Sequence, residues 1–375
     1  MADRAKKHII VAAGGTGGHV YPAIAIADAL RALSPELSIS FVGTSTHMEW
    51  KAVPKAGYSI DAIWVSGFQR RFTLKNFLFP FKLLVSIIQS HILLKRYQPI
   101  AVICAGGYVS GPVGYTAHLK KLPLYLQEQN SYPGVANRML AGYANRVFTA
   151  FEEAKKWFED TEVHNLGNPV RSVLASVDRK SALEVFNFAP NRPTLLIIGG
   201  SLGARSINQA LLEHIAELHD RLGLQIIWQC GKLYEAKIRE QLDVQAYSDL
   251  RLMSFIDDMP SAYSAADLIL SRAGASSLSE IQNMGKVSIL VPSPNVAGNH
   301  QYFNAKAMQD ADAALLLADA DLKKDLVPTI RKVLDQPSKM QRMADRVQNL
   351  AKPKAAEQIA AMILSDLEIP IKQSA

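Results

Sequence analysis

The sequence predicts an α/β protein made of two similar parallel-sheet units that face each other across a phosphate-binding cleft. Three observations predict it. Apolar runs of strand length alternate with helical patterns, which is typical of βαβ units. Glycine-rich turns follow such runs and precede helix-like stretches at residues 14–19, 106–112 and 199–204. The first and third turns begin the two halves of the chain, so the order of elements restarts in the second half.

Each half is expected to hold its own sheet, with the short apolar runs as strands. In the first half these are His8–Ala12, Ile39–Val42, Ile100–Cys104 and Leu124–Leu126, with helices at Pro22–Leu33 and Phe81–Tyr97. In the second half they are Thr194–Ile198, Gln225–Gln229, Leu268–Leu270, Val287–Val291 and Ala313–Leu317. Glycine and Asn-Pro punctuate the chain near Gly167–Arg171. We therefore expect a first domain over 1–168, a second over 169–352, and a last segment, 353–375, that packs back on the first.

Composition narrows the class of protein. With 375 residues, 49% of them hydrophobic and 20% charged, the chain can bury two ordinary cores. Cys104 and Cys230 have no CxxC partner, which argues against a disulfide framework or a structural zinc site and fits a reducing, cytoplasmic compartment. The apolar run near the start is too short for a signal peptide, and no run reaches membrane-spanning length. The net charge of +7 indicates an anionic partner.

The glycine turns are candidate phosphate sites, because backbone N–H groups at a strand-to-helix turn bind anions. They are not the dinucleotide fingerprint, since Val20 and Ser201 stand where that pattern requires glycine. The alternative is that glycine only lets a strand turn tightly into a helix. The recurrence of the turn in both halves favours ligand binding, because open α/β sheets bind ligands beyond the carboxyl ends of their strands.

A further strand, turn and helix start spans residues 267–280. Its glycine, its serine hydroxyls and the N–H groups of the first helical turn suit a diphosphate. Glu280 lies about one helical turn in, where a carboxylate accepts hydrogen bonds from both hydroxyls of a ribose. The alternative is a solvated glutamate that interacts favourably with the helix dipole.

Short strings along nearly the whole chain resemble the N-acetylglucosaminyltransferase family of peptidoglycan synthesis, which converts lipid I to lipid II. The strings are Gly14–His19, Gly106–Pro112, Glu128–Asn130, Gly167–Arg171, Gly199–Ala204, Phe255–Met259, Arg272–Glu280 and His300–Gln301. The resemblance implies a GT-B fold, two Rossmann-like domains around a deep cleft, with UDP-N-acetylglucosamine held mainly by the second domain. It also implies inverting transfer of the sugar to the C4 hydroxyl of the muramoyl unit of undecaprenyl-diphospho-muramoyl-pentapeptide, with release of UDP.

Carried over residue by residue, the resemblance implies a set of substrate contacts. These are Thr16, Gly17 and Gly18 from the first domain, Asn130 at the donor sugar, Arg171 and Ser201 at the nucleotide and diphosphate, Ile256 at the uracil, and Gln301 at a sugar hydroxyl. Ala275, Ser276, Ser277, Leu278, Ser279 and Glu280 match the phosphate and ribose contacts. Many members carry a charged residue where this chain has Gly298 and Asn299, which leaves the details of sugar recognition open.

Inverting transfer needs a base that takes the proton of the acceptor hydroxyl as its oxygen attacks the anomeric carbon. His19 is the candidate, because imidazole suits neutral pH and a helix N-terminus keeps it uncharged. The alternative is a histidine that orders the turn or contacts a phosphate. The turn amides, Ser201 and Arg171 are expected to stabilise the leaving UDP, which makes a metal unnecessary in principle. The sequence Asp319-Ala320-Asp321 is interpreted as a solvated turn rather than a metal-binding DxD motif.

Residues 68–88 interleave five phenylalanines with four cations and contain no acid. Such a stretch inserts its apolar side into a membrane interface, where each cation near an anionic leaflet contributes about 1 kcal/mol. The expected membrane contacts are Phe72, Leu74, Lys75, Phe77, Phe79, Phe81 and Lys82. The alternative is a loop that leads into a core helix, which fits residues 85–94 better than the residues before them. A nucleic-acid partner is not expected, because single-strand binders usually present such residues on a small β-barrel.

Two other functions stay open on the sequence alone. One is a UDP-N-acetylglucosamine 2-epimerase on the same fold, and the other is a non-catalytic peripheral membrane protein that senses nucleotide sugars. The membrane segment favours the transferase, because an epimerase has no lipid acceptor. The expected partners are UDP-N-acetylglucosamine, the lipid-linked acceptor, the anionic inner leaflet of the cytoplasmic membrane, and other cell-wall synthesis and division proteins. No tightly bound cofactor is expected, and dependence on divalent ions stays open.

Overall fold

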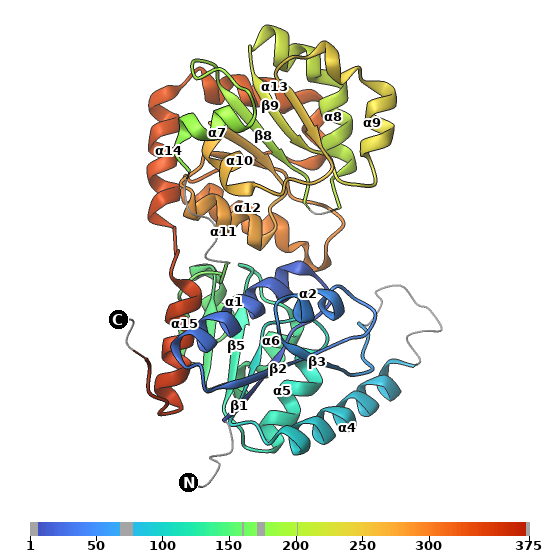
Figure 1. Cartoon of the computed structure of the whole chain (residues 1–375), viewed down its shortest axis with the longest axis vertical. Helices are drawn as coiled ribbons and strands as arrows, with labels where there is room; N and C mark the ends of the chain where they lie inside the picture. Colours follow the sequence, from blue (N-terminus) through green and yellow to red (C-terminus); the bar gives the residue numbers. More distant parts are fainter. Residues whose placement is uncertain (1–6, 68–77, 160, 171–176, 201, 373–375) are drawn as a thin grey trace. The chain divides into compact units, whose positions relative to one another are not determined.

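The computed structural model describes residues 7–67, 78–159, 161–170, 177–200 and 202–372 (Figure 1). Contacts divide the chain into two compact units. Unit 1 comprises residues 1–171 together with 353–375, and unit 2 comprises residues 172–352. Within the described ranges, no helix is both long and apolar enough to cross a membrane.

In the described residues of unit 1, seven strands form a parallel sheet in the order β3-β2-β1-β4-β5-β6-β7. The strands are β1 His8–Ala12, β2 Ser38–Gly43, β3 Ser59–Ala62, β4 Ala101–Cys104, β5 Leu124–Glu128, β6 Arg146–Thr149 and β7 Val163–Asn165. The α-helices in the described residues of this unit are α1 Gly17–Leu33, α2 Glu49–Lys55, α4 Phe79–Tyr97, α5 Ser110–Leu119, α6 Val135–Leu140 and α15 Ala355–Asp366. Successive strands joined by helices require a parallel sheet covered on both faces.

Alternate residues of β1 enter different cores, as a period of two requires. Ile9 and Val11 belong to the core that includes α1 and α15, whereas Ile10 and Ala12 belong to the core that includes α4 and α5. The C-terminal helix α15 packs on α1, and Arg146 of β6 binds Asp366 at its end with an Nε–Oδ2 distance of 2.6 Å. The chain therefore returns to unit 1 after completing unit 2 (Figure 1).

Unit 2, as far as its residues are described, holds a parallel sheet of six strands in the order β10-β9-β8-β11-β12-β13. The strands are β8 Thr194–Ile198, β9 Gln225–Gln229, β10 Leu250–Met253, β11 Leu268–Ser271, β12 Ser288–Leu290 and β13 Leu315–Leu316. The helices are α7 Arg179–Val185, α8 Arg205–Ala216, α9 Glu235–Gln241, α10 Met259–Ala265, α11 Ala275–Asn283, α12 His300–Asp310, α13 Leu322–Leu334 and α14 Pro337–Asn349.

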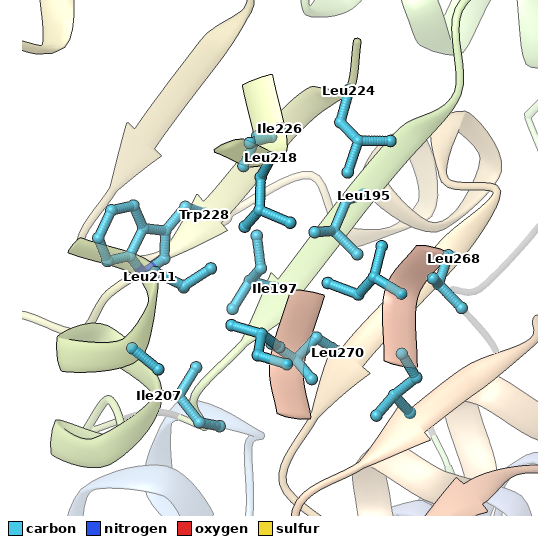
Figure 2. Close-up of a cluster of buried hydrophobic side chains, with 14 of the residues drawn as sticks. Leu195, Ile197, Ile207, Leu211, Leu218, Leu224, Ile226, Trp228, Leu268 and Leu270 are labelled. Carbon is cyan, nitrogen blue, oxygen red and sulfur yellow. The ribbon is translucent and has the colours of Figure 1, made fainter. Parts of the chain in front are cut away.

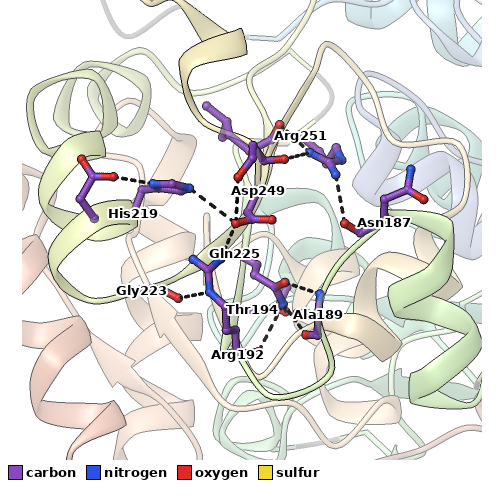
Figure 3. Close-up of polar contacts among 12 residues, drawn as sticks. Asn187, Ala189, Arg192, Thr194, His219, Gly223, Gln225, Asp249 and Arg251 are labelled. Atoms are coloured by element: carbon purple, nitrogen blue, oxygen red, sulfur yellow. Dashed lines mark hydrogen bonds and ion pairs between the residues drawn. The ribbon is translucent and has the colours of Figure 1, made fainter.

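Figure 2 shows the main core of unit 2, in which Leu195 and Ile197 of β8 and Ile207 and Leu211 of α8 belong to one buried cluster that also includes the fully buried Trp228. A polar network joins the loops that precede β8, β9 and β10 (Figure 3). There Nε of Arg192 donates to Gly223 O at 3.0 Å, and its Nη1 is ion-paired with Asp249. These contacts hold the end of the sheet opposite the glycine turns, so they serve the fold.

The structure extends the sequence prediction in two ways. Helix α1 begins at Gly17, five residues before the predicted start at Pro22, because the glycine turn itself forms the first helical turn. Four further strands, β3, β6, β7 and β10, have three or four residues each. Both sheets thus share the order 3-2-1-4-5-6 when each is counted from its own first strand. In such a sheet the strand order reverses beside the first strand, which is where ligands bind.

Candidate active site

The glycine turns and the serine-rich turn lie at the reversal points of the two sheets. In unit 1 the turns at 14–19 and 106–112 follow β1 and β4, which are hydrogen-bonded neighbours. In unit 2 the turns at 199–204 and 272–280 follow the neighbouring strands β8 and β11. Segments far apart in sequence are therefore brought together in pairs within each unit.

The first turn holds His19 by its backbone. Nδ1 of His19 lies 3.2 Å from the carbonyl oxygen of Gly14 and 3.4 Å from Oγ1 of Thr16, which is the N-cap residue of α1. A carbonyl oxygen only accepts, so the contact with Gly14 requires a proton on Nδ1. In the neutral ring the lone pair then lies on Nε2, which is the tautomer that a general base acting through Nε2 needs.

The second turn packs directly on the first, and only glycine fits there. Gly107 has a φ of +82°, and a Cβ atom on it would lie 2.2 Å from the carbonyl oxygen of Gly14. Gly106 has a φ of +95°, and its Cβ would lie 2.7 Å from Cδ2 and 3.1 Å from Nε2 of His19. These glycines therefore make room for the imidazole ring as well as for the turn.

A buried glutamate that the sequence analysis did not single out supports the first turn. Glu49, the first residue of α2, is 0% exposed. Its Oε2 accepts the N–H of Gly15 at 3.1 Å, and its Oε1 accepts the N–H and the hydroxyl of Thr44 at 3.1 and 2.7 Å. The expectation that the turn amides bind phosphate is thus corrected for Gly15, whose N–H bonds to a carboxylate.

Asn130 lies on a loop that is organised by Glu128. The buried carboxylate of Glu128 accepts four N–H groups, two from Asn130 and one each from Gly134 and Asn137, at 2.9–3.2 Å. Burial raises the pKa of Glu128, while these hydrogen bonds act in the opposite direction. The loop beyond β5 is therefore fixed from inside the unit, and Asn130 is placed by its main chain as well as its side chain.

In unit 2 the third glycine turn packs on the end of β9. Gly203 has a φ of +78°, and a Cβ on it would lie 2.0 Å from the carbonyl oxygen of Cys230. That same oxygen accepts Nδ2 of Asn208 at 2.8 Å, and Oδ1 of Asn208 accepts the indole N–H of Trp228 at 2.9 Å. Ser201 and Arg171, two of the expected substrate contacts, lie outside the described residues.

The N-terminus of α11 presents fewer groups for binding a phosphate than the sequence predicted. Leu278 is fully buried, its N–H bonds to Gly274 O at 3.0 Å, and the hydroxyl of Ser279 donates to Ala275 O at 2.9 Å. The first-turn amides of Ala275, Ser276 and Ser277 precede the helical hydrogen-bond ladder. Oγ of Ser276 is buried and has no hydrogen-bond partner among the described residues. This turn is therefore a candidate anion site in which the side chains of Leu278 and Ser279 have a structural role.

Glu280 is held by a tyrosine that the sequence analysis missed. The hydroxyl of the buried Tyr263 donates to Oε2 of Glu280 at 2.8 Å. Burial raises the pKa of Glu280, and the bond from Tyr263 opposes that shift. Burial and the neighbouring Glu280 together raise the pKa of Tyr263 well above its ordinary value. Glu280 is thus no freely solvated first-turn residue.

The two remaining substrate-contact candidates of unit 2 are Ile256 and Gln301. The side chain of Ile256 is 2% exposed, so a contact with a base would involve its main chain, whereas the neighbouring Phe255 is half exposed. Oε1 of Gln301 accepts the N–H of Ser293 at 2.8 Å, which ties α12 to the loop after β12. The nitrogen of the same side-chain amide, Nε2 of Gln301, is the group that could donate to a sugar hydroxyl.

Asp319 corrects the interpretation of residues 319–321 as a solvated turn. Its Oδ1 lies 2.5 Å from Nη1 of Arg272 and 2.6 Å from Oγ of Ser206, and Nη2 of Arg272 donates to the same hydroxyl at 2.8 Å. Asp321 is exposed. Asp319 therefore joins the ends of β11 and α8. In the described part of the chain, no cluster of three or more His, Cys, Asp or Glu side chains could hold a metal ion.

The membrane candidates fall partly on helix α4. Phe72, Leu74, Lys75 and Phe77 lie outside the described residues. Phe81 is exposed, Lys82 donates to Oγ of Ser66 at 3.2 Å, and Phe79 is partly exposed. Trp64, which the sequence analysis missed, lies edge-on to Phe81, with Lys82 Nζ 5.4 Å from the Trp64 ring centroid.

Comparison with known proteins agrees with this architecture. The N-terminal domain model of glycosyltransferase family 28 matches residues 9–149, and its C-terminal domain model matches residues 194–359. A protein of Christiangramia forsetii, named UDP-N-acetylglucosamine--N-acetylmuramyl-(pentapeptide) pyrophosphoryl-undecaprenol N-acetylglucosamine transferase, is 43% identical over 94% of this chain and 95% of its own. The crystal structure of Acinetobacter baumannii MurG superposes with a TM-score of 0.78 and 29% identity, over 96% of this chain and 99% of that one.

A UDP-GlcNAc 2-epimerase of Neisseria meningitidis bound to UDP-GlcNAc shares the fold with a TM-score of 0.63, at 14% identity over 96% of this chain and 100% of that one. The two parallel-sheet units have the GT-B fold, and the family models and the named relatives show that the chain is a glycosyltransferase of that fold. More narrowly, the chain belongs to glycosyltransferase family 28.

Proposed function

We infer that this protein transfers N-acetylglucosamine from UDP-N-acetylglucosamine to the C4 hydroxyl of the muramoyl unit of undecaprenyl-diphospho-muramoyl-pentapeptide. Its relatives are named for this transfer, and they match it at 37–43% identity over nearly the whole chain. The 2-epimerase alternative shares only the fold. The reaction forms a bond from the acceptor oxygen to the anomeric carbon and breaks the bond to the diphosphate, whose oxygen keeps the electron pair.

Unit 2 is proposed to bind the donor. The first-turn amides of α11 and the buried hydroxyl of Ser276 are suited to hold the diphosphate, and Glu280 is suited to accept the ribose hydroxyls. The proposed roles of Ser201, Arg171, Ile256 and Gln301 complete this set. Charge that grows on the leaving diphosphate would meet preorganised N–H groups, which is where electrostatic stabilisation is most effective.

Unit 1 is proposed to supply the base. The contact between Nδ1 of His19 and Gly14 O is the observation that carries this assignment, because it fixes the tautomer with the lone pair on Nε2. His19 is the third residue of α1, so the helix N-terminus favours the neutral ring before reaction. Thr16, Gly17, Gly18 and Asn130 are proposed to line the same edge of the sheet, where the donor sugar would lie.

The acceptor carries a long lipid, and α4 is the proposed membrane-contacting surface. Phe81, Leu84, Ile88 and Ile92 recur at helical spacing and are 52–57% exposed. The first turn of the helix carries Lys82, and its last turn carries Lys95 and Arg96. An apolar stripe with cations beside it suits the interface of an anionic leaflet. This supports a peripheral attachment to the cytoplasmic face of the membrane.

The test is UDP release from UDP-N-acetylglucosamine with and without a soluble lipid I analogue, with identification of the sugar product. The proposal predicts release that depends on the acceptor and yields the disaccharide. UDP release or formation of the 2-epimer that does not depend on the acceptor would instead indicate an epimerase. Donor binding without turnover under both conditions would establish a sensor.

A further inference from the structure

We propose that Glu49 is a positioning residue for His19 and acts through the single peptide group that joins Gly14 to Gly15. The carbonyl oxygen of that peptide accepts Nδ1–H of His19 at 3.2 Å, and its N–H donates to Oε2 of Glu49 at 3.1 Å. Imidazole, peptide and carboxylate thus form one chain of hydrogen bonds. The proposal rests on the proposed role of His19 as base.

The peptide group is well suited to this role, because donation by its N–H increases the negative charge on its carbonyl oxygen. Hydrogen bonds in such a chain polarise one another, and a carboxylate acceptor makes the effect stronger. The carbonyl of Gly14 therefore accepts the proton on Nδ1 more strongly than an ordinary backbone carbonyl. This favours the Nδ1–H tautomer and keeps the lone pair on Nε2.

The burial of Glu49 explains why its charge matters at this turn. The side chain is 0% exposed, and among the described residues no lysine or arginine forms an ion pair with it. Oε1 is occupied by Thr44, and a Cβ on Gly14 would lie 2.9 Å from that oxygen, so the carboxylate sits directly behind the turn. The carboxylate of Glu49 therefore faces the same peptide group whose carbonyl oxygen contacts the imidazole of His19.

During transfer, Nε2 of His19 takes the proton of the acceptor hydroxyl as the new glycosidic bond forms. The ring then carries a positive charge, which the N-terminus of α1 disfavours. The carboxylate of Glu49 offsets that cost through the peptide without taking a proton itself. The arrangement corresponds to the carboxylate and histidine of a hydrolase triad with one peptide group inserted between them.

The first measurement is the tautomer of His19 by ¹⁵N NMR of protein labelled at histidine, with the His19 signals among the nine histidines identified by their loss in His19→Gln. The wild type should show Nδ1–H and an unprotonated Nε2. A wild-type ring protonated on Nε2 would overturn the proposal without any variant at Glu49. In Glu49→Gln, where one oxygen acceptor is replaced by an NH₂ group, the Nε2–H tautomer should become populated.

The second measurement is the kinetics of Glu49→Gln. Loss of an outer partner of this kind is expected to lower kcat about ten- to a hundredfold, with KM for the donor changed less than about threefold. Thr44→Val is the matched control, because it removes the hydroxyl bond to Oε1 and keeps the link to Gly15. If Glu49→Gln lowers kcat no more than Thr44→Val, or leaves the tautomer unchanged, Glu49 only stabilises the turn. If His19→Gln keeps the kcat of the wild type while Glu49→Gln still changes the tautomer of His19, the assignment of His19 as base fails. Glu49 would then still be the residue that sets the tautomer of His19.

Discussion

The hydroxyl of Tyr263 on α10 donates to Oε2 of Glu280 on α11 across 2.8 Å. Tyr263 is fully buried behind the helix, while Glu280 keeps part of its side chain exposed. One carboxylate oxygen is therefore held from inside unit 2. The residue that is proposed to bind the ribose reaches the surface in a fixed orientation, which lowers the entropic cost of binding.

Tyr263→Phe should weaken donor binding. The change removes one hydrogen bond to a charged group, worth about 1.5–3 kcal/mol, so KM for UDP-N-acetylglucosamine should rise roughly tenfold or more. The kcat at saturating donor should change much less, because the bond orients a binding residue. Steady-state kinetics measures both values, and an unchanged KM would show that Glu280 needs no support from Tyr263.

The pH dependence of stability should report the burial of Glu280. Burial raises its pKa above the unfolded value of 4.5, so folding favours the protonated form. That contribution is complete below pH 4.5 and is lost as pH rises through the pKa of the folded protein. Glu280→Gln, which stays neutral, should therefore have a higher Tm than the wild type at neutral pH, and the difference should vanish as pH falls toward 4.5.

Glu240→Gln is the control for this measurement, because Glu240 is exposed on α9. Its Tm difference from the wild type should be small at every pH. A Glu280→Gln protein that is less stable than the wild type at neutral pH would contradict the direction of the shift.

Gly106→Ala should damage catalysis more than folding. The added Cβ would lie 2.7 Å from Cδ2 of His19 at a φ of +95°, so the ring has to move. Misplacement of a base by about 1 Å costs on the order of a hundredfold in kcat. Gly142→Ala, whose Cβ meets nothing within 4 Å, is the matched control and should keep wild-type kcat. Equal activities for the two variants would mean that the position of His19 is unimportant.

Asp319→Ala and Asp321→Ala should separate the structural and metal-binding interpretations of residues 319–321. Asp319 pairs with Arg272, and the two side chains are 21% and 12% exposed. Its removal leaves a mostly buried cation and should lower the free energy of unfolding by about 2–4 kcal/mol. The exposed Asp321 should contribute less than about 0.5 kcal/mol. Chemical denaturation measures the free energy of unfolding of both variants. If the two variants lose equal stability, and the loss depends on added metal, residues 319–321 are a metal-binding motif.

The double variant Leu84→Gln and Ile88→Gln should weaken attachment to membranes. Both side chains are about half exposed on α4, so the thermal midpoint should change little. Each loses about 1.5–3 kcal/mol of burial in the interface, and binding to vesicles with anionic lipid should fall at least about tenfold. Val185→Gln removes a similarly exposed apolar residue from unit 2 and should leave vesicle binding unchanged. If the double variant binds vesicles as well as Val185→Gln does, α4 is excluded as the membrane contact.

Much of this fold was predictable, because long buried strands and glycine turns leave local signals. Thr194–Ile198 and Gln225–Gln229 were predicted with their observed bounds, since parallel strands buried on both faces appear as continuous apolar runs. Strands β3 and β7 were missed because they are short, lie at the sheet edges and include polar residues.

The supporting residues of the site could not be predicted in the same way. Glu49 lies 34 residues from Gly15, and Tyr263 lies 17 residues from Glu280, so each pairing depends on how strands are ordered in the sheet. The one available signal was position, since Glu49 follows the carboxyl end of β2 as the glycine turn follows that of β1. A buried carboxylate beside a glycine turn becomes visible only once the sheet is assembled.

The measurement that tests the central claim most directly is kcat for acceptor-dependent UDP release by His19→Gln at saturating donor and acceptor. If Nε2 of His19 is the base, kcat should fall about a hundredfold or more while the dissociation constant for UDP-N-acetylglucosamine stays near that of the wild type. A variant that keeps kcat within about threefold of the wild type would contradict the assignment and leave His19 as a residue that orders the turn.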